Sequence, residues 1–471
     1  MTSGGKRQRS YAQDRALWES WLRPRRRGLD SWRQYPALQQ PDWPDPAAAT
    51  AALDRLKANP PLVFAGEARD LQESLARALE GRAFLLQAGD CVESFNELSA
   101  IRIREKLKIM LQMSAVLTYG ATLPVVKVGR IAGQFTKPRS DAFERVGAEE
   151  IPSFRGHMVN DDARTAEARV PDPQRMVEGY NQSAATLNLL RAFTKGGYAD
   201  LTQVHMWNKD FVSSSPEGQR YELLASEIER ALAFMAACGI DLAAERRLHE
   251  VDFYTSHEGL LLDYEEGLTR KDSLTGDWYD CSAHLLWIGE RTRQLDGAHT
   301  EFFAGVHNPL GVKLGPAATA DDAVGLCEKL NPLRVPGRLT FYARMGAERV
   351  RELLPPLLKA IKDEGHPVLW ASDPMHANTI RTDAGVKTRR FDTIMSELEG
   401  FFAACREAGV WPGGVHLEFT GEDVTECLGG ADDVLEEQLS SRYETLLDPR
   451  LNARQALDLA FRLAELMRRP F

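Results

Sequence analysis

The chain has 471 residues, 43% of them hydrophobic, so it can bury the core of one large domain or of two to three ordinary ones. Its formal net charge of −10 argues against general nucleic-acid binding, because an acidic chain repels a phosphate backbone. The six cysteines are scattered without a CxxC pair, which argues against a disulfide scaffold and fits a reducing, cytoplasmic setting. We find no run of ~20 apolar residues that could span a bilayer and no signal-peptide core near Met1, and we expect no membrane association.

Residues 1–30 form a basic arm in this acidic chain, with the run Arg25-Arg26-Arg27 near its end. A transit peptide would be poor in acids, and Asp14 and Glu19 weaken that interpretation. We favour a short amphipathic helix over residues 11–22 that covers a subunit surface. After the arm, the patterns over Ala47–Ala58 and Ala65–Glu80 predict two helices that precede the repeating part of the chain.

From Phe84 onward, short apolar runs alternate with longer helical patterns, which predicts βα units around a parallel sheet or barrel. The candidate strands are Phe84–Gln87, Val125–Ile131, Leu201–Trp207, Val251–Tyr254, His284–Ile288, Gly311–Leu314, Leu339–Ala343, Val368–Ala371 and Val415–Phe419. A (β/α)8 barrel uses eight strands, and Leu201–Trp207 is our candidate for the extra one because no evident site residue follows it. We therefore expect residues 31–471 to form one (β/α)8 TIM barrel with an N-terminal extension, inserted helices and a polar excursion near 150–200.

One predicted strand leads into a basic loop. Val125–Ile131 is rich in β-branched residues and too short for a typical helix, and a glycine and a proline follow it. Arg130, Lys137 and Arg139 would then lie at or just beyond the C-terminal end of the strand, where parallel sheets and barrels bind ligands. Guanidinium and ammonium groups suit a phosphorylated substrate, whereas the alternative is a solvated basic loop.

Three other predicted strands end near residues that bind metals. Cys91 follows the first strand, His376 follows the strand Val368–Ala371, and Glu418 lies in the last strand. Taken singly, a cysteine is more often a buried apolar residue and a histidine more often a hydrogen-bonded one. A thiolate, an imidazole and a carboxylate from three strand ends could nevertheless converge on one divalent ion.

More cations follow the same rule. Arg291, Lys313 and Arg344 each lie in or just after a predicted strand. Each alone would be better explained as a surface salt bridge. Together with the three cations of the basic loop they predict a strongly cationic rim, which one or two anionic substrates would explain better than a solvated surface would.

Seven longer motifs accompany these residues. They are Gln87–Phe95, Arg130–Ser140, Ser256–Glu258, Trp287–His299, Asn308–Lys313, Asp373–His376 and Glu418–Gly430. In these motifs the chain closely resembles the type II (plant-like) 3-deoxy-D-arabino-heptulosonate 7-phosphate (DAHP) synthases, from about Ser31 to near the C-terminus. The resemblance implies a (β/α)8 barrel enzyme that condenses phosphoenolpyruvate with erythrose 4-phosphate and water, the first step of the shikimate pathway.

The resemblance also implies roles for individual residues. It implies that the metal ligands are Cys91, His376, Glu418 and Asp448; the ends of the predicted strands alone do not point to Asp448. It also implies that phosphoenolpyruvate is bound by Arg130, Glu290, Arg291, Lys313 and Arg344, and that erythrose 4-phosphate is bound by Lys137, Pro138, Arg139 and Ser140. In the reaction, either Lys137 or a metal-bound water would donate the proton, and Glu258 would be the partner of the attacking water.

Several properties stay open at this point. The mixed sulfur, nitrogen and oxygen ligands do not select one ion: we expect Mn²⁺ or Co²⁺, with Fe²⁺, Zn²⁺ and Mg²⁺ as alternatives. An amino-DAHP synthase of a secondary pathway, using an iminoerythrose phosphate, is the nearest rival function. A non-catalytic, metal-binding regulatory paralogue is a third, although such a protein need not keep all the ligands and cations. The resemblance also implies a homo-oligomer, a dimer or a tetramer.

Overall fold

The structure is a computed structural model that describes residues 28–468 apart from 215–218, 220–221 and 240–250. The helix predicted over residues 11–22 lies outside the described residues. Eight parallel strands close into a barrel in the order β1-β2-β5-β8-β9-β10-β11-β14, with β14 pairing back to β1. The barrel strands are β1 Phe84–Gly89, β2 Val125–Arg130, β5 Tyr254–Glu258, β8 Leu285–Ile288, β9 Leu310–Leu314, β10 Leu339–Ala343, β11 Val368–Ser372 and β14 Gly414–Glu418. The predicted (β/α)8 barrel is confirmed.

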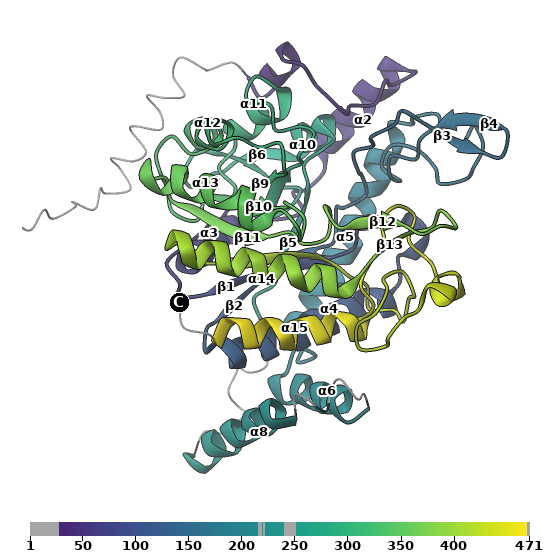
Figure 1. Ribbon diagram of the computed structural model, residues 1–471. Coiled ribbons are helices and arrows are strands. Elements are labelled where there is room, and N and C mark those ends of the chain that lie inside the picture. Colours follow the sequence, from purple (N-terminus) through teal and green to yellow (C-terminus); the bar gives the residue numbers. More distant parts are fainter. Residues whose placement is uncertain (1–27, 215–218, 220–221, 240–250, 469–471) are drawn as a thin grey trace, which may run out of the picture.

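Helices surround this barrel in Figure 1. They are α2 Pro46–Ala58, α3 Ala65–Leu79, α4 Ala100–Ala121, α5 Gln174–Lys195, α6 Leu201–Ser214, α8 Glu222–Ala237, α10 Leu262–Leu268, α11 Ala298–Ala304, α12 Ala320–Leu330, α13 Val350–Asp363, α14 Phe391–Ala408 and α15 Ala453–Arg468. Short 3₁₀ helices cover η2 Ser31–Gln34, η3 Phe95–Glu97 and η4 Glu436–Ser441. The two predicted N-terminal helices correspond to α2 and α3, and α2 begins where Asp45 accepts hydrogen bonds from the N–H groups of Ala47 and Ala48.

Side chains alternate between the inside and the outside of the barrel. Leu86 of β1 and Val312 of β9 belong to the large apolar cluster between strands and helices. Leu85 and Leu285 belong instead to a smaller cluster, which also contains Leu71 of α3. These two leucines face inward and lie near the start of their strands, so their packing with Leu71 places α3 across the N-terminal end of the barrel. The C-terminal end of the barrel is not covered by α3.

Three two-stranded sheets extend beyond the barrel. They are β3 Phe143–Val146 with β4 Glu149–Pro152, β6 Thr269–Lys271 with β7 Trp278–Asp280, and β12 Thr379–Arg381 with β13 Lys387–Arg389. The β3–β4 hairpin, α5, α6 and α8 all come between β2 and β5, and α6 and α8 project from the body of the molecule (Figure 1).

Two of the strand predictions need correction. Leu201–Trp207, the extra candidate, begins helix α6, in which Val204, Asn208 and Phe211 are buried at helical spacing. A short apolar run cannot distinguish a strand from a buried helix by periodicity alone. The strand predicted over Val251–Tyr254 lies too early in the chain, since β5 begins at Tyr254 and continues to Glu258. Polar residues that face the barrel interior hid the rest of that strand from the hydrophobic pattern.

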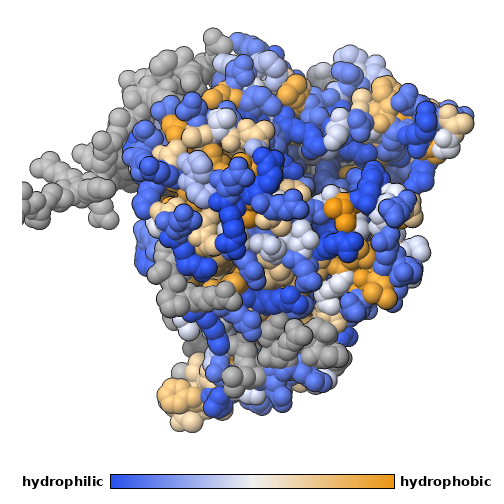
Figure 2. All heavy atoms as spheres, viewed as in Figure 1, coloured by the Kyte–Doolittle hydropathy of each residue, from blue (hydrophilic) through white to orange (hydrophobic). Residues whose placement is uncertain are grey.

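Apolar side chains form several small groups on the face seen in Figure 2, one of them at the lower end of the view, over the α6–α8 pair. Among the described residues, no helix combines the length and the hydrophobicity needed to cross a membrane.

Candidate active site

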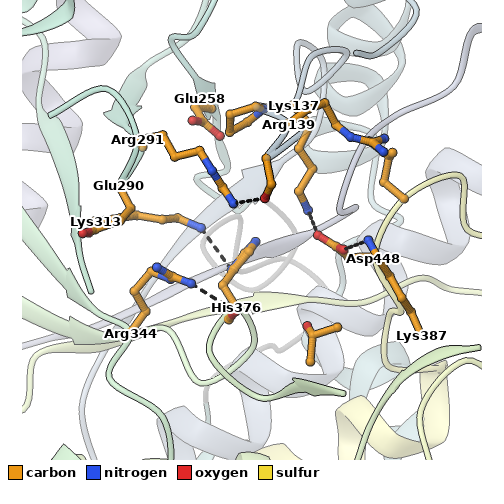
Figure 3. A pocket seen from close by; sticks show the side chains of 15 residues that line it. Lys137, Arg139, Glu258, Glu290, Arg291, Lys313, Arg344, His376, Lys387 and Asp448 are labelled. Atoms are coloured by element: carbon orange, nitrogen blue, oxygen red, sulfur yellow. Dashed lines mark hydrogen bonds and ion pairs between the residues drawn. The ribbon is translucent and has the colours of Figure 1, made fainter. Parts of the chain in front are cut away.

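A cavity of ≈ 250 Å³ opens at the C-terminal end of the barrel (Figure 3). Eleven of the predicted site residues line it: Lys137, Pro138, Arg139, Ser140, Glu258, Glu290, Arg291, Lys313, Arg344, His376 and Asp448. The other three, Cys91, Arg130 and Glu418, are fully buried. Cys91 and Glu418 contact Lys137 of this group, and Arg130 contacts Glu418. The structure therefore brings all the predicted site residues together.

The strand register explains much of this convergence. Arg130, Glu258, Lys313 and Glu418 are the last inward-facing residues of β2, β5, β9 and β14. In a closed barrel, these positions form one ring at the C-terminal end, above the layers that fill the interior. Side chains far apart in sequence thus meet without any help from the loops.

Four potential metal ligands lie within this ring or just above it. Atoms of Cys91, Glu418 and Asp448 all lie within 4.8 Å of one another. His376 Nε2 is 2.9 Å from Glu418 Oε1. The other ring nitrogen of His376 is 2.9 Å from the carboxylate of Asp373, an arrangement that orients metal-binding histidines in many proteins.

The Lys137 ammonium lies at the centre of the ligand group. Its Nζ is 2.7 Å from Cys91 Sγ, 2.6 Å from Asp448 Oδ2 and 3.3 Å from Glu418 Oε1. A positive charge is thus already surrounded by three of the four proposed ligands. The mixed thiol, imidazole and carboxylate donors suit a divalent transition metal, so these residues fit such an ion.

The charges of this group depend on one another. Burial raises the pKa of the Cys91 thiol to about 11, with Glu418 adding to the effect and Lys137 opposing it. Burial also raises the pKa of Glu418, but His376, Lys137, Arg389 and Arg130 outweigh it and hold the pKa well below its usual range. The carboxylate is therefore ionised at neutral pH.

The cavity wall is strongly cationic, with six lysines and arginines against three carboxylates. Lys313 Nζ pairs with Asp373 at 2.9 Å, and Arg344 donates to the His376 carbonyl at 3.1 Å. Arg291 donates to Ser140 Oγ at 2.6 Å, which joins the loop after β8 to the loop after β2 (Figure 3). The excess positive charge makes this a site for anions.

Two of the predicted cations have strong protein contacts of their own. Arg130 pairs with Glu418 at 2.9 Å, donates to the carbonyls of Asp90 and Cys91, and lies over the Trp287 ring. Arg139 donates to the Phe154 carbonyl and pairs with Glu144 of the β3–β4 hairpin. Arg130 thus holds the floor of the site, and Arg139 joins its rim to the hairpin.

Comparisons with known proteins agree with this geometry. The sequence profile of the Class-II DAHP synthetase family matches residues 27–464. A phospho-2-dehydro-3-deoxyheptonate aldolase of Streptomyces coelicolor is 55% identical to this chain, in an alignment that covers 93% of this chain and 97% of the relative. The phospho-2-dehydro-3-deoxyheptonate aldolase AroG of Mycolicibacterium smegmatis is 50% identical, in an alignment that covers 94% of this chain and 95% of the relative. The chain belongs to the Class-II DAHP synthetase family.

A solved structure was matched as well. It is the phospho-2-dehydro-3-deoxyheptonate aldolase from Francisella tularensis SCHU S4, with 13% identity, a TM-score of 0.46 and coverage of 88% of this chain and 97% of that one. The barrel of this DAHP synthetase family member is established by its own strand pairing and not by that likeness.

Some residues of this DAHP synthetase site were missed by the sequence analysis. Arg389 is fully buried and pairs with Glu418 Oε2 at 2.8 Å, while Lys387 pairs with Asp448 at 3.1 Å. Both lie on β13, a short strand outside the barrel, so the rule of looking at barrel strand ends could not find them. Asp373 lay within a motif that we used, but its contacts with His376 and Lys313 appear only in three dimensions.

Glu258, the predicted catalytic carboxyl, lines the cavity. Its Oε1 is buried and has no hydrogen-bond partner among the described residues. Burial raises the pKa of Glu258, with Lys313 and Lys137 opposing the effect. A Cβ at Gly289 would lie 2.0 Å from Oε1, so a larger residue there would displace this oxygen. The free oxygen can bond to a water molecule or a substrate.

Proposed function

We propose that this protein is a DAHP synthase, which condenses phosphoenolpyruvate with D-erythrose 4-phosphate and water and releases phosphate. The proposal rests on one observation: in this member of the Class-II DAHP synthetase family, four potential metal ligands and six cations lie together at one cavity. The two substrates are both polyanions and repel each other, so a cationic cavity is what their condensation requires.

Phosphoenolpyruvate is assigned to the side of the cavity formed by β2, β8, β9 and β10. Arg291, Lys313 and Arg344 line this side, and Arg130 lies in its floor. Lys313 and Arg344 are already oriented by Asp373 and the His376 carbonyl, so little side-chain entropy would be lost on binding. Glu290 accepts from the Gly315 N–H at 2.6 Å and fixes the neighbouring loop.

Erythrose 4-phosphate is assigned to the loop after β2. Lys137, Pro138, Arg139 and Ser140 line this part of the cavity, and Lys137 contacts the ligand group. A divalent ion held by Cys91, His376, Glu418 and Asp448 would polarise the aldehyde oxygen as a Lewis acid. The new carbon–carbon bond forms between the aldehyde carbon and C3 of phosphoenolpyruvate.

The remaining steps need one proton and one water molecule. Bond formation leaves negative charge on the former aldehyde oxygen, and Lys137 is close enough to the ligand group to donate a proton to it. The same step leaves positive character at C2 of phosphoenolpyruvate, and water attacks there. Glu258, with its free Oε1, is suited to orient that water and accept a proton, after which phosphate leaves with its bridging oxygen.

The test is to follow the loss of phosphoenolpyruvate by its ultraviolet absorbance, with erythrose 4-phosphate present and Mn²⁺ or Co²⁺ added to metal-stripped protein. We expect turnover that needs both substrates and an ion. Absence of turnover with every divalent ion would refute the proposal and favour the non-catalytic paralogue.

The same assay separates the nearest rival function. An amino-DAHP synthase would turn over an iminoerythrose phosphate in preference to erythrose 4-phosphate. We expect the reverse order of kcat/KM. The cytoplasmic location and the homo-oligomeric state inferred from the sequence stay predictions, and size-exclusion chromatography with light scattering tests the second.

A further inference from the structure

The turn that follows β2 is held by a single buried carboxylate. Ala132 N–H donates to Glu93 Oε2 at 3.0 Å, and the N–H groups of Gly133 and Gln134 donate to Glu93 Oε1 at 2.9 and 2.8 Å. In return, the Glu93 N–H donates to the Gln134 carbonyl at 2.6 Å. Four hydrogen bonds therefore join the loop after β1 to the loop after β2.

The backbone of this turn is shaped for a carboxylate. Ala132 has a φ of 64°, a left-handed conformation that residues with a Cβ disfavour. Such a turn points successive N–H groups into one concavity, which binds an anion. A Cβ at Gly133 would lie 2.4 Å from His257 Nδ1, so the turn is also pressed closely against β5. Without an acceptor at its centre, this turn would have three buried donors unpaired.

The turn joins three parts of the site. Glu93 comes two residues after Cys91, and the turn comes three residues before Lys137. The Gln134 side chain extends the link, because its Oε1 accepts from the Glu258 N–H at 2.9 Å. A displacement of the turn would thus move Lys137 and Glu258 relative to Cys91.

We propose that Glu93 is a positioning residue that fixes the loop from Lys137 to Ser140 against Cys91, and so controls productive binding of the aldehyde substrate. The inference rests on the proposed function, which assigns that loop to erythrose 4-phosphate. Lys313 and Arg344 lie on β9 and just after β10 and are held by Asp373 and the His376 carbonyl. Arg130, also assigned to phosphoenolpyruvate, lies within β2 before the turn and is held by its pair with Glu418. Glu93 therefore acts mainly on the erythrose 4-phosphate half of the site.

The test is Glu93→Gln, which keeps the shape but places an NH₂ group against a backbone N–H. The lost acceptor should lower kcat/KM for erythrose 4-phosphate ~10- to 100-fold, chiefly through a higher KM. The KM for phosphoenolpyruvate should change by less than about twofold, since Lys313 and Arg344 belong to other strands and Arg130 is held within β2 by Glu418. If Glu93 had only a general structural role, its substitution would change both KM values to a similar extent.

A second readout does not depend on turnover. In the Co²⁺-loaded protein, the thiolate-to-cobalt absorption band reports the geometry at Cys91. We expect the band to persist in Glu93→Gln with a shift in position or intensity, because Cys91 is kept but its neighbouring loop is displaced. An unchanged band together with unchanged KM values would overturn the inference.

Asp272→Asn is the matched control. Asp272 accepts hydrogen bonds from the N–H and the hydroxyl of Thr275 in the segment between β6 and β7. The chemical change is the same, but Asp272 does not line the cavity. We expect both KM values and the cobalt band to match those of the unmodified protein.

Folding of each variant is checked by circular dichroism. If Glu93→Gln is unfolded, Glu93→Asp replaces it. The charge remains, but the side chain is one methylene shorter, so its carboxylate cannot reach all three donors. A selective rise in KM for erythrose 4-phosphate supports the inference, and equal changes in both KM values, or none, overturn it. Failure of the unmodified protein to turn over would refute the proposed function instead, so the two outcomes are distinguishable.

Discussion

The two halves of the cavity are built in different ways. On the phosphoenolpyruvate side, Lys313 lies within β9, and the register of the closed barrel fixes its position. On the side of the ligand group, Lys137 and Asp448 lie on long loops and are held by contacts between side chains: Nζ and Oδ2 are 2.6 Å apart, and Asp448 also pairs with Lys387 at 3.1 Å. Changes on the loop side should therefore be sensitive to the metal concentration.

The largest effect is expected at Cys91, where the two halves meet. Cys91→Ala removes the only sulfur donor of the ligand group, and the loss of Lewis-acid stabilisation should lower kcat by at least ~10³-fold. The thiolate-to-cobalt absorption band should disappear at the same time. Cys327→Ala in α12 is the matched control, since it removes an equally buried thiol far from the cavity. A fully active Cys91→Ala protein would contradict the ligand assignment.

The next effect tests the strand side. Lys313→Met should lower kcat/KM for phosphoenolpyruvate ~10²- to 10³-fold, because it removes a substrate contact and leaves buried Asp373 without this cation. Lys127→Met is the control, because Lys127 is also a strand lysine but lines a different cavity, next to α4 and α6. We expect steady-state kinetics to separate the two variants. Similar losses in both would mean that strand placement does not decide function.

The same contrast explains how far the sequence could predict the site. Arg130, Lys313 and Glu418 were found because a barrel strand is a short apolar run and its C-terminal end is where ligands bind. Cys91 and His376 follow strands closely enough for the same rule to find them. Strand ends alone therefore located most of the ligand group.

Loop residues had no such signal. Asp448 lies thirty residues after the end of β14, in an irregular segment, and only the family resemblance pointed to it. Arg389 and Lys387 lie on β13, whose three residues carry no apolar pattern. Helix α6 was mistaken for a strand for the opposite reason, since its start is apolar but its helical period appears only over a longer stretch. Long-range contacts, which a single sequence does not reveal, decide the first two cases.

A smaller effect should come from the loop side. Asp448→Asn keeps the shape but removes a charge that Lys137 and Lys387 both contact, at 2.6 and 3.1 Å. We expect a ~10- to 100-fold loss of activity at limiting Mn²⁺ or Co²⁺, because charge-assisted contacts are worth ~1.5–3 kcal/mol each. High metal concentration should restore part of the loss. A titration of activity against metal measures this, and an unchanged metal dependence would contradict the ligand role of Asp448.

The smallest effect is expected where the two halves touch at the rim. Ser140 Oγ accepts from Arg291 at 2.6 Å in an exposed contact between the loops after β2 and β8. Ser140→Ala removes one neutral acceptor, worth ~1 kcal/mol, and should raise KM for erythrose 4-phosphate about fivefold. Arg291 also loses this contact, and KM for phosphoenolpyruvate should rise by about twofold. Steady-state kinetics with each substrate varied in turn measures both. A larger rise for phosphoenolpyruvate would mean that Ser140 acts by orienting Arg291 and belongs to the strand side of the site.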